Sequence, residues 1–136
     1  MTTNVFRYSC RVTYAQCTVG NHIYYARYLD ILEAARGEFA RELGMPLGVL
    51  QEQDTIFPVI GVDLSYKAAA RYDDVLTTEV WVTECGGVRL SFGCRILKED
   101  GTVIVEGVTK HVCTTRDEKP KRLPKEIVEK LTAHLR

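Results

Sequence analysis

The chain has 136 residues, of which 46% are hydrophobic and 26% are charged, a composition typical of a globular domain rather than a disordered segment. Eighteen basic residues balance eighteen acidic ones, so bulk charge favours neither a nucleic-acid nor a membrane partner. No apolar run approaches the roughly 20 residues of a membrane span, and the N-terminal residues lack the apolar core of a signal peptide. We therefore expect one domain, residues 1–136, in the cytoplasm.

The first part of the chain predicts a strand followed by a long helix. Residues 5–15 mix β-branched and aromatic side chains with loose alternation, which indicates a strand. Gly20 interrupts this pattern, and apolar residues then recur at steps of three and four over residues 26–43, which predicts an amphipathic helix. Gly44 supplies the stop signal at the end of that helix.

The rest of the chain predicts four more strands and a short final helix. The strands span residues 59–72, 75–84, 88–97 and 102–115, with Gly107 as a bulge, and the helix spans 124–134. Short turns join the last three strands, so these should form an antiparallel meander. A sheet covered on one face by a single long helix leaves an edge strand open, and pairing of that edge in a homodimer is the usual solution.

The cysteines are odd in number, widely spaced and contain no Cys-x-x-Cys pair. They are Cys10, Cys17, Cys85, Cys94 and Cys113. This pattern supports neither a zinc site nor a disulfide framework. It favours reduced thiols packed mostly in strands, because free cysteine is among the most buried residue types.

Three segments of the chain resemble one known family in register. Residues 12–36, VTYAQCTVGNHIYYARYLDILEAAR, are similar to the family's strand, glycine turn, aromatic residue, tyrosine and Glu-x-x-Arg helix motif, here at Gly20, Tyr24, Tyr28, Glu33 and Arg36. Residues 66–76, YKAAARYDDVL, are similar to its second strand with a Tyr-Asp-Asp turn, and residues 112–124 to its closing strand. Together they resemble the hotdog fold, and more narrowly the 4-hydroxybenzoyl-CoA thioesterase and YbgC-like acyl-CoA thioesterases.

The resemblance implies an α+β hotdog fold, in which a curved antiparallel five-stranded sheet is wrapped around one long central helix. It implies a cytoplasmic hydrolase that cleaves the thioester of acyl-CoA, or of acyl carrier protein. It also implies a homodimer or a homotetramer built as a dimer of dimers, with active sites at the dimer interface. No metal and no organic cofactor is implied beyond the CoA of the substrate.

One departure from the family falls at the centre of its chemistry. Where the family has Asp-x-Asp, this chain has Gln16, Cys17 and Thr18, so the family's usual nucleophile or general base falls on Thr18. A histidine often found on the helix side of the turn falls on Tyr25. Residues 21–23, Asn-His-Ile, resemble instead the Gly-His-Val turn of related acyl thioesterases, which keep an acid at the position of Thr18.

Hydrolysis without that acid needs an oxyanion donor and another base. By resemblance the donor is the N–H of Tyr25 at the start of the helix, which any side chain would preserve. His22 is the favoured base, since imidazole suits neutral pH, and the alternative is a turn histidine bonded to local backbone. Glu33 is the second candidate base, and its alternative is an i,i+3 ion pair with Arg36.

The other residues of the turn are weaker candidates for a catalytic role. Asn21 could orient a water or the thioester oxygen, or serve only as turn chemistry. Thr18 can hold a water but needs a base beside it to act further. Cys17 as a nucleophile would need a neighbour that stabilises a thiolate, and burial is its default. Tyr24 and Tyr28 are expected in the pocket wall and the core, respectively.

Three functions follow from this scaffold. The prediction is a thioester hydrolase whose catalytic acid is replaced by Thr18, an arrangement that resembles some polyketide-releasing hotdog thioesterases. The alternative is a non-catalytic acyl-thioester binding protein with the same pocket. A hotdog dehydratase is a third, but it would pair a histidine with an acid across the dimer, a pattern that Glu33 and the Tyr-Asp-Asp turn do not resemble. In the hydrolase, Asn21, His22 and Tyr25 should line a cleft completed by a partner subunit.

Overall fold

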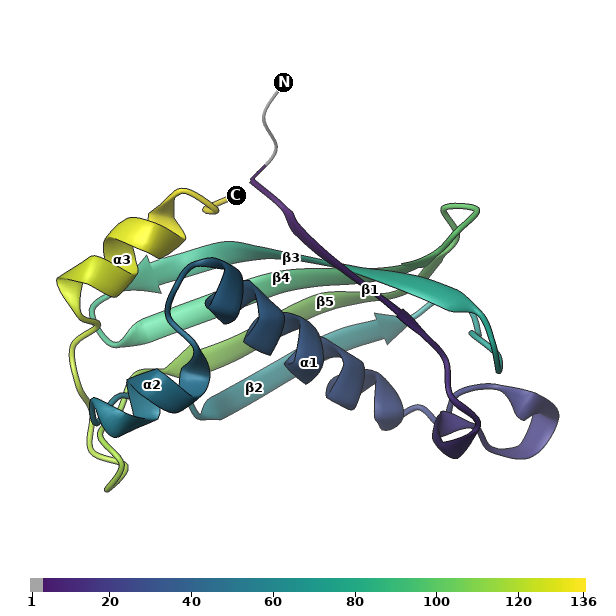
Figure 1. Ribbon diagram of the computed structural model, residues 1–136, viewed down its shortest axis with the longest axis horizontal. Helices are drawn as coiled ribbons and strands as arrows, with labels where there is room; N and C mark the ends of the chain where they lie inside the picture. The colour runs from purple at the N-terminus through teal and green to yellow at the C-terminus, as the bar shows by residue number, and fades with distance from the viewer. Residues whose placement is uncertain (1–3) are drawn as a thin grey trace.

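A five-stranded antiparallel sheet with α-helices packed on one face makes up residues 4–136, the part of the chain that the computed structural model describes (Figure 1). The strands are β1 (Phe6–Arg11), β2 (Val59–Tyr66), β3 (Val75–Gly86), β4 (Arg89–Lys98) and β5 (Val103–Val112). The α-helices are α1 (Arg27–Glu42), α2 (Leu47–Glu52) and α3 (Lys125–Thr132). The order across the sheet is β1-β3-β4-β5-β2, so β1 and β2 are its two edges.

The helix α1 lies across the inner face of the sheet, as the periodicity of residues 26–43 predicts (Figure 1). Its buried residues recur at helical spacing and face the strands: Tyr28, Ile31, Leu32, Ala35, Phe39 and Ala40. Burial alternates along the facing strand β3, in which every second residue is buried: Leu76, Thr78, Val80 and Val82. A sheet with period-two burial and a helix with an apolar stripe therefore form a common core between them.

The outer face of the sheet is polar and carries alternating charges. Arg7 of β1 pairs with Glu79 of β3 at 3.0 Å, and Arg95 of β4 lies 3.7 Å from the same carboxylate. Glu106 of β5 lies 3.0 Å from Lys67. The Glu79 side chain is only 13% exposed, whereas Lys67 and Glu106 are 50% and 41% exposed, and exposed pairs add little stability each.

Several predicted boundaries differ from the structure. The first strand ends at Arg11 rather than at residue 15, because the chain turns into a capping box in which Gln16 Oε1 accepts the N–H of Thr13 at 2.9 Å. The second strand ends at Tyr66 rather than at residue 72. The helix α2 lies between residues 43 and 59, where the sequence predicts neither a helix nor a strand; it spans six residues, too few to show a helical period.

Gly107 is not the bulge that the sequence predicts. It pairs in regular register with Cys94 of β4 and Leu64 of β2, and the register shifts of this sheet fall elsewhere. The reason for a glycine here is steric, since a Cβ atom would collide with the backbone carbonyl of Asp63 and lie 2.9 Å from the Cα of Leu64. Gly107 therefore lets the edge strand β2 approach β5 closely.

The edge strand β2 exposes apolar side chains. The exposed fractions are 48% for Val59, 60% for Ile60, 47% for Val62 and 48% for Tyr66. Natural sheets seldom leave a long apolar edge without cover, because its unpaired N–H and C=O groups can pair with another strand. Within the described residues, β2 has a strand neighbour, β5, on one side alone.

The described residues were compared with the requirements of disulfides, metal sites and membrane-spanning helices. All five cysteines are free thiols, as predicted, and Cys94 and Cys113 are buried. Within residues 4–136 no group of three or more His, Cys, Asp or Glu side chains could hold a metal ion. No helix in that same range is long and apolar enough to cross a membrane.

The close approach at Gly107 gives a stability prediction. Gly107→Ala should lower the free energy of unfolding by about 1–3 kcal/mol, because β2 must move away from the added methyl group. Gly37→Ala on α1 is the matched control, since no atom lies within 4 Å of its added Cβ. That change should stabilise the helix by up to about 1 kcal/mol. Urea denaturation measures both, and equal stability of Gly107→Ala and the parent chain would refute the steric argument.

Candidate functional site

The loop between β1 and α1 is held in one shape by its own backbone hydrogen bonds. Thr18 donates its N–H to the carbonyl of His22 at 2.9 Å and accepts the N–H of Asn21 at 3.0 Å. Gly20 and Asn21 have φ values of +81° and +60°, a left-handed conformation for which glycine and asparagine are the favoured residues. Ile23 donates to the carbonyl of Ala70 at 2.9 Å, which ties the turn to the segment after β2. The predicted cluster is therefore an ordered turn.

The backbone N–H groups of the two residues directly before α1 are available to a ligand. Arg27 donates to the carbonyl of Tyr24 at 2.8 Å, and Tyr28 donates to that of Tyr25 at 3.4 Å. By contrast, the N–H groups of Tyr25 and Ala26 donate to no acceptor within residues 4–136. Two free donors at the positive end of a 16-residue helix are suited to an oxyanion.

His22 lies over Gly20 inside the same turn. Its Cδ2 and Nε2 atoms are 3.0 and 3.2 Å from the place where a Cβ of Gly20 would lie, so this glycine also makes room for the ring. The Nδ1 atom lies 3.4 Å from the carbonyl of Ile23. A carbonyl only accepts, so this contact assigns the proton to Nδ1 and leaves Nε2 as a base. No carboxylate in the described chain hydrogen-bonds to the ring.

The remaining turn residues occupy different surroundings. The side chains of Thr18 and Asn21 are exposed beside His22. The thiol of Cys17 is half-buried and donates to the carbonyl of Thr13 at 3.6 Å. Tyr28 is buried, and its hydroxyl accepts the N–H of Ala70 at 3.2 Å.

Aromatic rings surround the turn on its exposed side. Tyr24 and Tyr25 lie 4.8 Å apart by ring centroid, and Tyr66 at the end of β2 meets Tyr25 edge-on at 6.3 Å. The hydroxyl of Tyr66 donates to the carbonyl of Tyr25 at 3.4 Å. Tyr24 is 42% exposed and Tyr25 62%, so both rings are open to contact with a ligand or a partner.

Glu33 does not join this group within one chain. It lies eight residues beyond Tyr25, roughly 12 Å along the helix axis at 1.5 Å per residue. Its side chain is exposed and lines a pocket at the other half of α1. Glu33 and Arg36 are three residues apart, which allows an ion pair, but they form none in the described part of the chain.

That pocket lies between the sheet and the three helices and has a volume of about 380 Å³. The helices contribute Phe39, Leu43, Leu50, Ile127 and Leu131 among others, and the strands contribute Leu90, Phe92 and His111. The loop before β2 adds residues 55–58. Its size falls at the lower end of the range for small-molecule sites, and its walls are mainly apolar, as in most such sites.

Comparison with known proteins identifies the scaffold. The family model described as the thioesterase-like superfamily matches residues 12–131. The chain belongs to this superfamily. Acyl-CoA thioester hydrolase YbgC of Escherichia coli O6:H1 is 33% identical over 129 residues, which cover 94% of this chain and 96% of the relative. Acyl-CoA thioesterase YbgC of Haemophilus influenzae is also 33% identical, with 93% and 94% covered.

A solved structure agrees with the sequence relatives. The crystal structure of a hypothetical protein from Aquifex aeolicus superposes with a TM-score of 0.88 at 27% identity, covering 93% of this chain and 98% of that one. The chain is thus a YbgC-like hotdog thioesterase, as the three segments in register predict.

This YbgC-like chain contains a buried histidine that sequence reasoning missed. His111 of β5 is 4% exposed, its Nδ1 lies 3.1 Å from the carbonyl of Phe57, and its Nε2 lies 3.0 Å from the hydroxyl of Thr109. Because the carbonyl only accepts, Nδ1 carries the proton and Nε2 accepts from Thr109. The alternation of β5 was the signal available, since Thr109 and His111 share its inward face.

Burial is the main cause that lowers the pKa of His111, and the nearby guanidinium of Arg36 lowers it further, although the bond to Phe57 opposes both. The imidazole is therefore neutral in the folded chain at neutral pH. It joins β5 to the segment that leads into the edge strand β2.

Arg36 itself was expected only as a partner for Glu33. Its side chain is half-buried and lines the pocket, and burial lowers the pKa of the guanidinium while Cys94 and Glu33 oppose that effect. Neither a hydrogen bond nor an ion pair within residues 4–136 engages this guanidinium. The pocket thus holds one cation that makes no ion pair with a carboxylate of the described residues, although Glu33 lies near enough to raise its pKa.

His111 gives a pH prediction whose sign follows from its lowered pKa. The unfolded chain binds a proton below about pH 6.5 that the folded chain excludes, so this residue should make stability fall as the pH drops through 6.5. His111→Gln should lower the free energy of unfolding by about 1–3 kcal/mol at pH 8, because the hydrogen bonds of the imidazole are not all remade. The variant should also lack the part of the pH dependence of stability that His111 causes.

Urea denaturation of the parent chain and of His111→Gln between about pH 5 and pH 8 measures the difference directly. Other titrating groups are common to both proteins and cancel in the comparison. Parallel pH profiles for the two proteins would show that the buried imidazole does not resist protonation.

Proposed function

We propose that this chain hydrolyses acyl-CoA thioesters at the turn formed by residues 18–25, with Thr18 standing where the family has its catalytic acid. The free N–H groups of Tyr25 and Ala26 next to His22 are the observation that carries the proposal. The two YbgC relatives at 33% identity, both named for acyl-CoA thioester cleavage, support the substrate class.

The proposed reaction uses the turn as follows. The thioester carbonyl accepts hydrogen bonds from Tyr25 and Ala26, whose donors stabilise the oxyanion that forms when water attacks. Nε2 of His22 takes the proton of the attacking water and returns it to the departing CoA thiolate, so that the products are a carboxylic acid and the thiol. In this proposal the Thr18 hydroxyl and the Asn21 amide hold the water. Since a thioester is already reactive toward water, a carboxylate is not indispensable.

A homodimer would complete the site. If two β2 strands pair antiparallel, the two sheets become continuous, and the beginning of each strand lies beside the end of the other. Val59 at the beginning lines the pocket, and Tyr66 at the end contacts Tyr25. Pairing would therefore bring the pocket of one protomer beside the turn of its partner.

This assembly also accounts for the finer predictions about the fold. Residues 1–136 act as one hotdog domain, with the curved sheet of each protomer wrapped around α1 as its central helix. Glu33, distant from the turn in its own chain, would lie near the turn of the partner. A dimer of dimers, substrates carried by acyl carrier protein, and a cytoplasmic location stay predictions.

One observation favours a second function, a non-catalytic acyl-thioester binding protein. His22 has no carboxylate partner among the described residues, so nothing holds its ring as the third member of a triad would. A binder would use the same N–H groups and pocket without turnover. Release of free thiol from a panel of acyl-CoAs by the purified protein separates the two functions.

Assignment of the base gives the next prediction. His22→Ala should lower kcat by about 100-fold, the usual scale for a positioned general base, and Thr18→Asp should raise hydrolysis by restoring the family's carboxylate. Glu33→Gln should have a smaller effect, and Glu38→Gln is its matched control, since Glu38 pairs with Arg41 outside the pocket. Melting temperatures of all variants show whether each one is folded.

Two results would change this assignment. If Glu33→Gln abolishes turnover while His22→Ala does not, the helix carboxylate is the base. If the parent chain has no activity and Thr18→Asp creates it, the natural protein is the binder.

The edge of β2 gives a prediction about assembly. Val62→Lys places a charge on an exposed apolar edge, which should convert a dimer into monomers. Val49→Lys is the matched control, since Val49 on α2 is exposed to a similar extent and does not line the pocket. Light scattering after size-exclusion chromatography gives the masses, and an unchanged dimer for Val62→Lys would exclude this edge as the interface.

A further inference from the structure

The two free N–H groups before α1 belong to two neighbouring peptide units. The N–H of Tyr25 shares a peptide unit with the carbonyl of Tyr24, and the N–H of Ala26 shares one with the carbonyl of Tyr25. In a trans peptide unit the C=O and N–H groups lie in one plane and point in opposite directions. A hydrogen bond to either carbonyl therefore fixes the direction of the N–H group in the same unit and also polarises it.

The helix itself supports these two carbonyls unequally. The carbonyl of Tyr24 accepts the N–H of Arg27 at 2.8 Å, within the usual range of a backbone hydrogen bond. The carbonyl of Tyr25 accepts the N–H of Tyr28 at 3.4 Å, which is beyond that range. The peptide unit that carries the N–H of Ala26 is therefore the less firmly held of the two.

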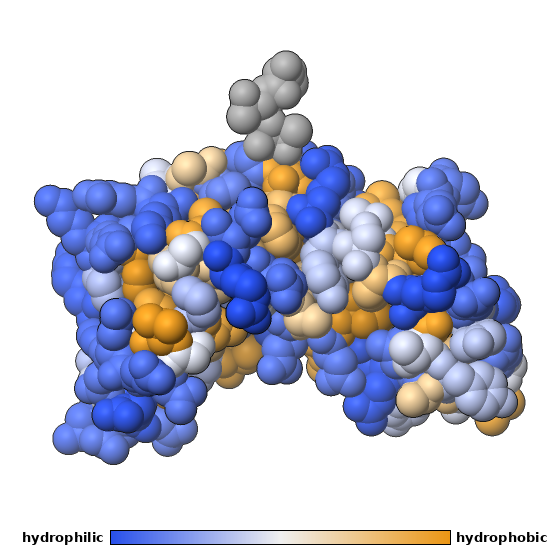
Figure 2. Space-filling view, in the orientation of Figure 1, coloured by the Kyte–Doolittle hydropathy of each residue, from blue (hydrophilic) through white to orange (hydrophobic). Residues whose placement is uncertain are grey.

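The edge strand β2 gives this peptide unit a second support. The hydroxyl of Tyr66, the last residue of β2, donates to the carbonyl of Tyr25 at 3.4 Å. The Tyr66 ring lies 5.7 Å from the ring of Tyr28 and 6.3 Å from that of Tyr25, measured between centroids. The end of β2 and the beginning of α1 thus meet at one end of the molecule (Figure 1), where exposed tyrosines give a surface of intermediate hydropathy (Figure 2).

The sheet holds Tyr66 in place. Tyr66 pairs with Val105 of β5. The next residue, Lys67, donates its N–H to the carbonyl of Ile104 at 2.8 Å, and its side chain lies 3.0 Å from the carboxylate of Glu106. The position of the Tyr66 hydroxyl is therefore set by the pairing of β2 with β5.

We infer that Tyr66 is a positioning residue for the oxyanion site, whose hydroxyl aligns and polarises the peptide unit that carries the N–H of Ala26. The inference rests on the proposed function for the rate of hydrolysis, but not for the state of the Ala26 amide. The 3.4 Å distance is long for an O–H···O bond, and hydrogen bonds of catalytic sites often stay long until the substrate binds. In this role Tyr66 acts through the main chain and needs no contact with the substrate.

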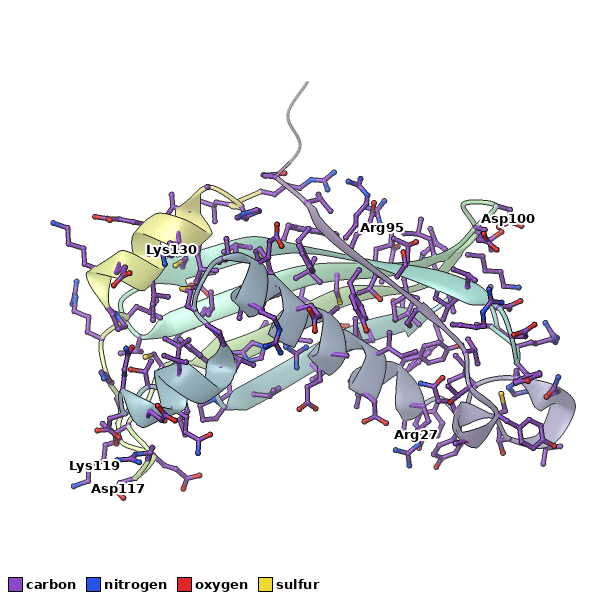
Figure 3. The ribbon with its side chains drawn as sticks, in the orientation of Figure 1. Arg27, Arg95, Asp100, Asp117, Lys119 and Lys130 are labelled. Carbon is purple, nitrogen blue, oxygen red and sulfur yellow. The ribbon has the colours of Figure 1, made fainter. Side chains whose placement is uncertain are left out.

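Arg27 is the charged side chain nearest in sequence to the two donors, and it does not provide this support. It pairs with Asp30 at 2.9 Å and extends from the beginning of α1 away from the sheet (Figure 3). Its charge is thus matched by a carboxylate at an exposed position, where solvent and salt screen its effect on the donors.

The amide resonance of Ala26 tests the inference without requiring activity. A hydrogen bond to a carbonyl deshields the amide nitrogen of the same peptide unit. Tyr66→Phe keeps the ring and removes the donor, so it should move the Ala26 signal upfield in a two-dimensional proton–nitrogen NMR spectrum. The signal of Tyr25 should stay in place, because the carbonyl of Tyr24 keeps its own hydrogen bond.

Tyr72→Phe is the matched control. Tyr72 is 48% exposed, as Tyr66 is, and its ring packs edge-on against that of Tyr14. Its hydroxyl bonds to no carbonyl of the turn within residues 4–136, and its N–H, which donates to the carbonyl of Asn21, is kept in the variant. This substitution should leave both the Ala26 signal and kcat unchanged.

The kinetic effect should be small and confined to kcat. Loss of a whole oxyanion donor costs about 100- to 1,000-fold, and a supporting hydrogen bond strengthens a donor by about 10–30%. Applied to the logarithm of the rate, these figures predict that Tyr66→Phe lowers kcat about 2- to 8-fold with KM unchanged. A fluorinated tyrosine in place of Tyr66 has a more acidic hydroxyl. It should therefore raise kcat and move the Ala26 signal downfield, at a pH at which it stays protonated.

Each outcome bears on the inference directly. An Ala26 signal that moves no more in Tyr66→Phe than in Tyr72→Phe would overturn it, as would the expected shift with kcat unchanged in an active protein. A raised KM with unchanged kcat would make Tyr66 a substrate contact and would also overturn it. If the parent chain hydrolyses no acyl-CoA, the expected shift of the Ala26 signal supports the inference while the proposed function fails.

Discussion

The packing of α1 on the inner face of the sheet is the constraint on which the site depends. Tyr28 anchors its first turn by accepting the N–H of Ala70, and Ile23 just before it donates to the carbonyl of the same alanine. These two bonds fix the beginning of the helix against the segment that follows β2. The N–H groups of Tyr25 and Ala26 therefore have a set position, which an oxyanion donor requires because its value lies in needing no rearrangement.

The same packing divides the core into two parts with different properties. Around the first half of α1 the core is closed by Leu32, Ile96 and Ile104, all of which are fully buried. Around the second half, Phe39 and Leu131 contribute to a core that leaves the pocket open. The closed half of the core therefore lies beside the N–H groups of Tyr25 and Ala26, and the pocket lies at the other half of the helix.

Periodicity made most of the fold predictable. The helical stripe of residues 26–43 and the alternation of β3 pack against each other in the core, so local pattern and tertiary structure agree. The exceptions have physical reasons. The helix α2 is too short to show a period, and Gly107 is required by contact with β2, a strand some 40 residues earlier whose approach no local pattern reveals.

The site was predictable only where one short segment determines it. The turn around Gly20 and His22 is local, so its residues could be named from the sequence. The lack of an ion pair between Arg36 and Glu33 could not be predicted, because their i,i+3 spacing suggests such a pair and only the side-chain placement excludes it. His111 depends on contacts with Phe57, 54 residues away in the chain.

In the proposed hydrolase, replacement of the acid by Thr18 is tolerable because main-chain and side-chain groups of the turn differ in how mutation can affect them. The donors at Tyr25 and Ala26 belong to the main chain, and no side-chain substitution there removes them. Each such donor is worth about 100- to 1,000-fold in rate, a range similar to that of a positioned base. A turn that loses its carboxylate thus keeps a large share of its transition-state stabilisation, and a nearby imidazole can take over the remaining proton transfer. The requirement that persists is geometric: Gly20 must keep its left-handed conformation, since any other residue would both strain the turn and displace the ring of His22.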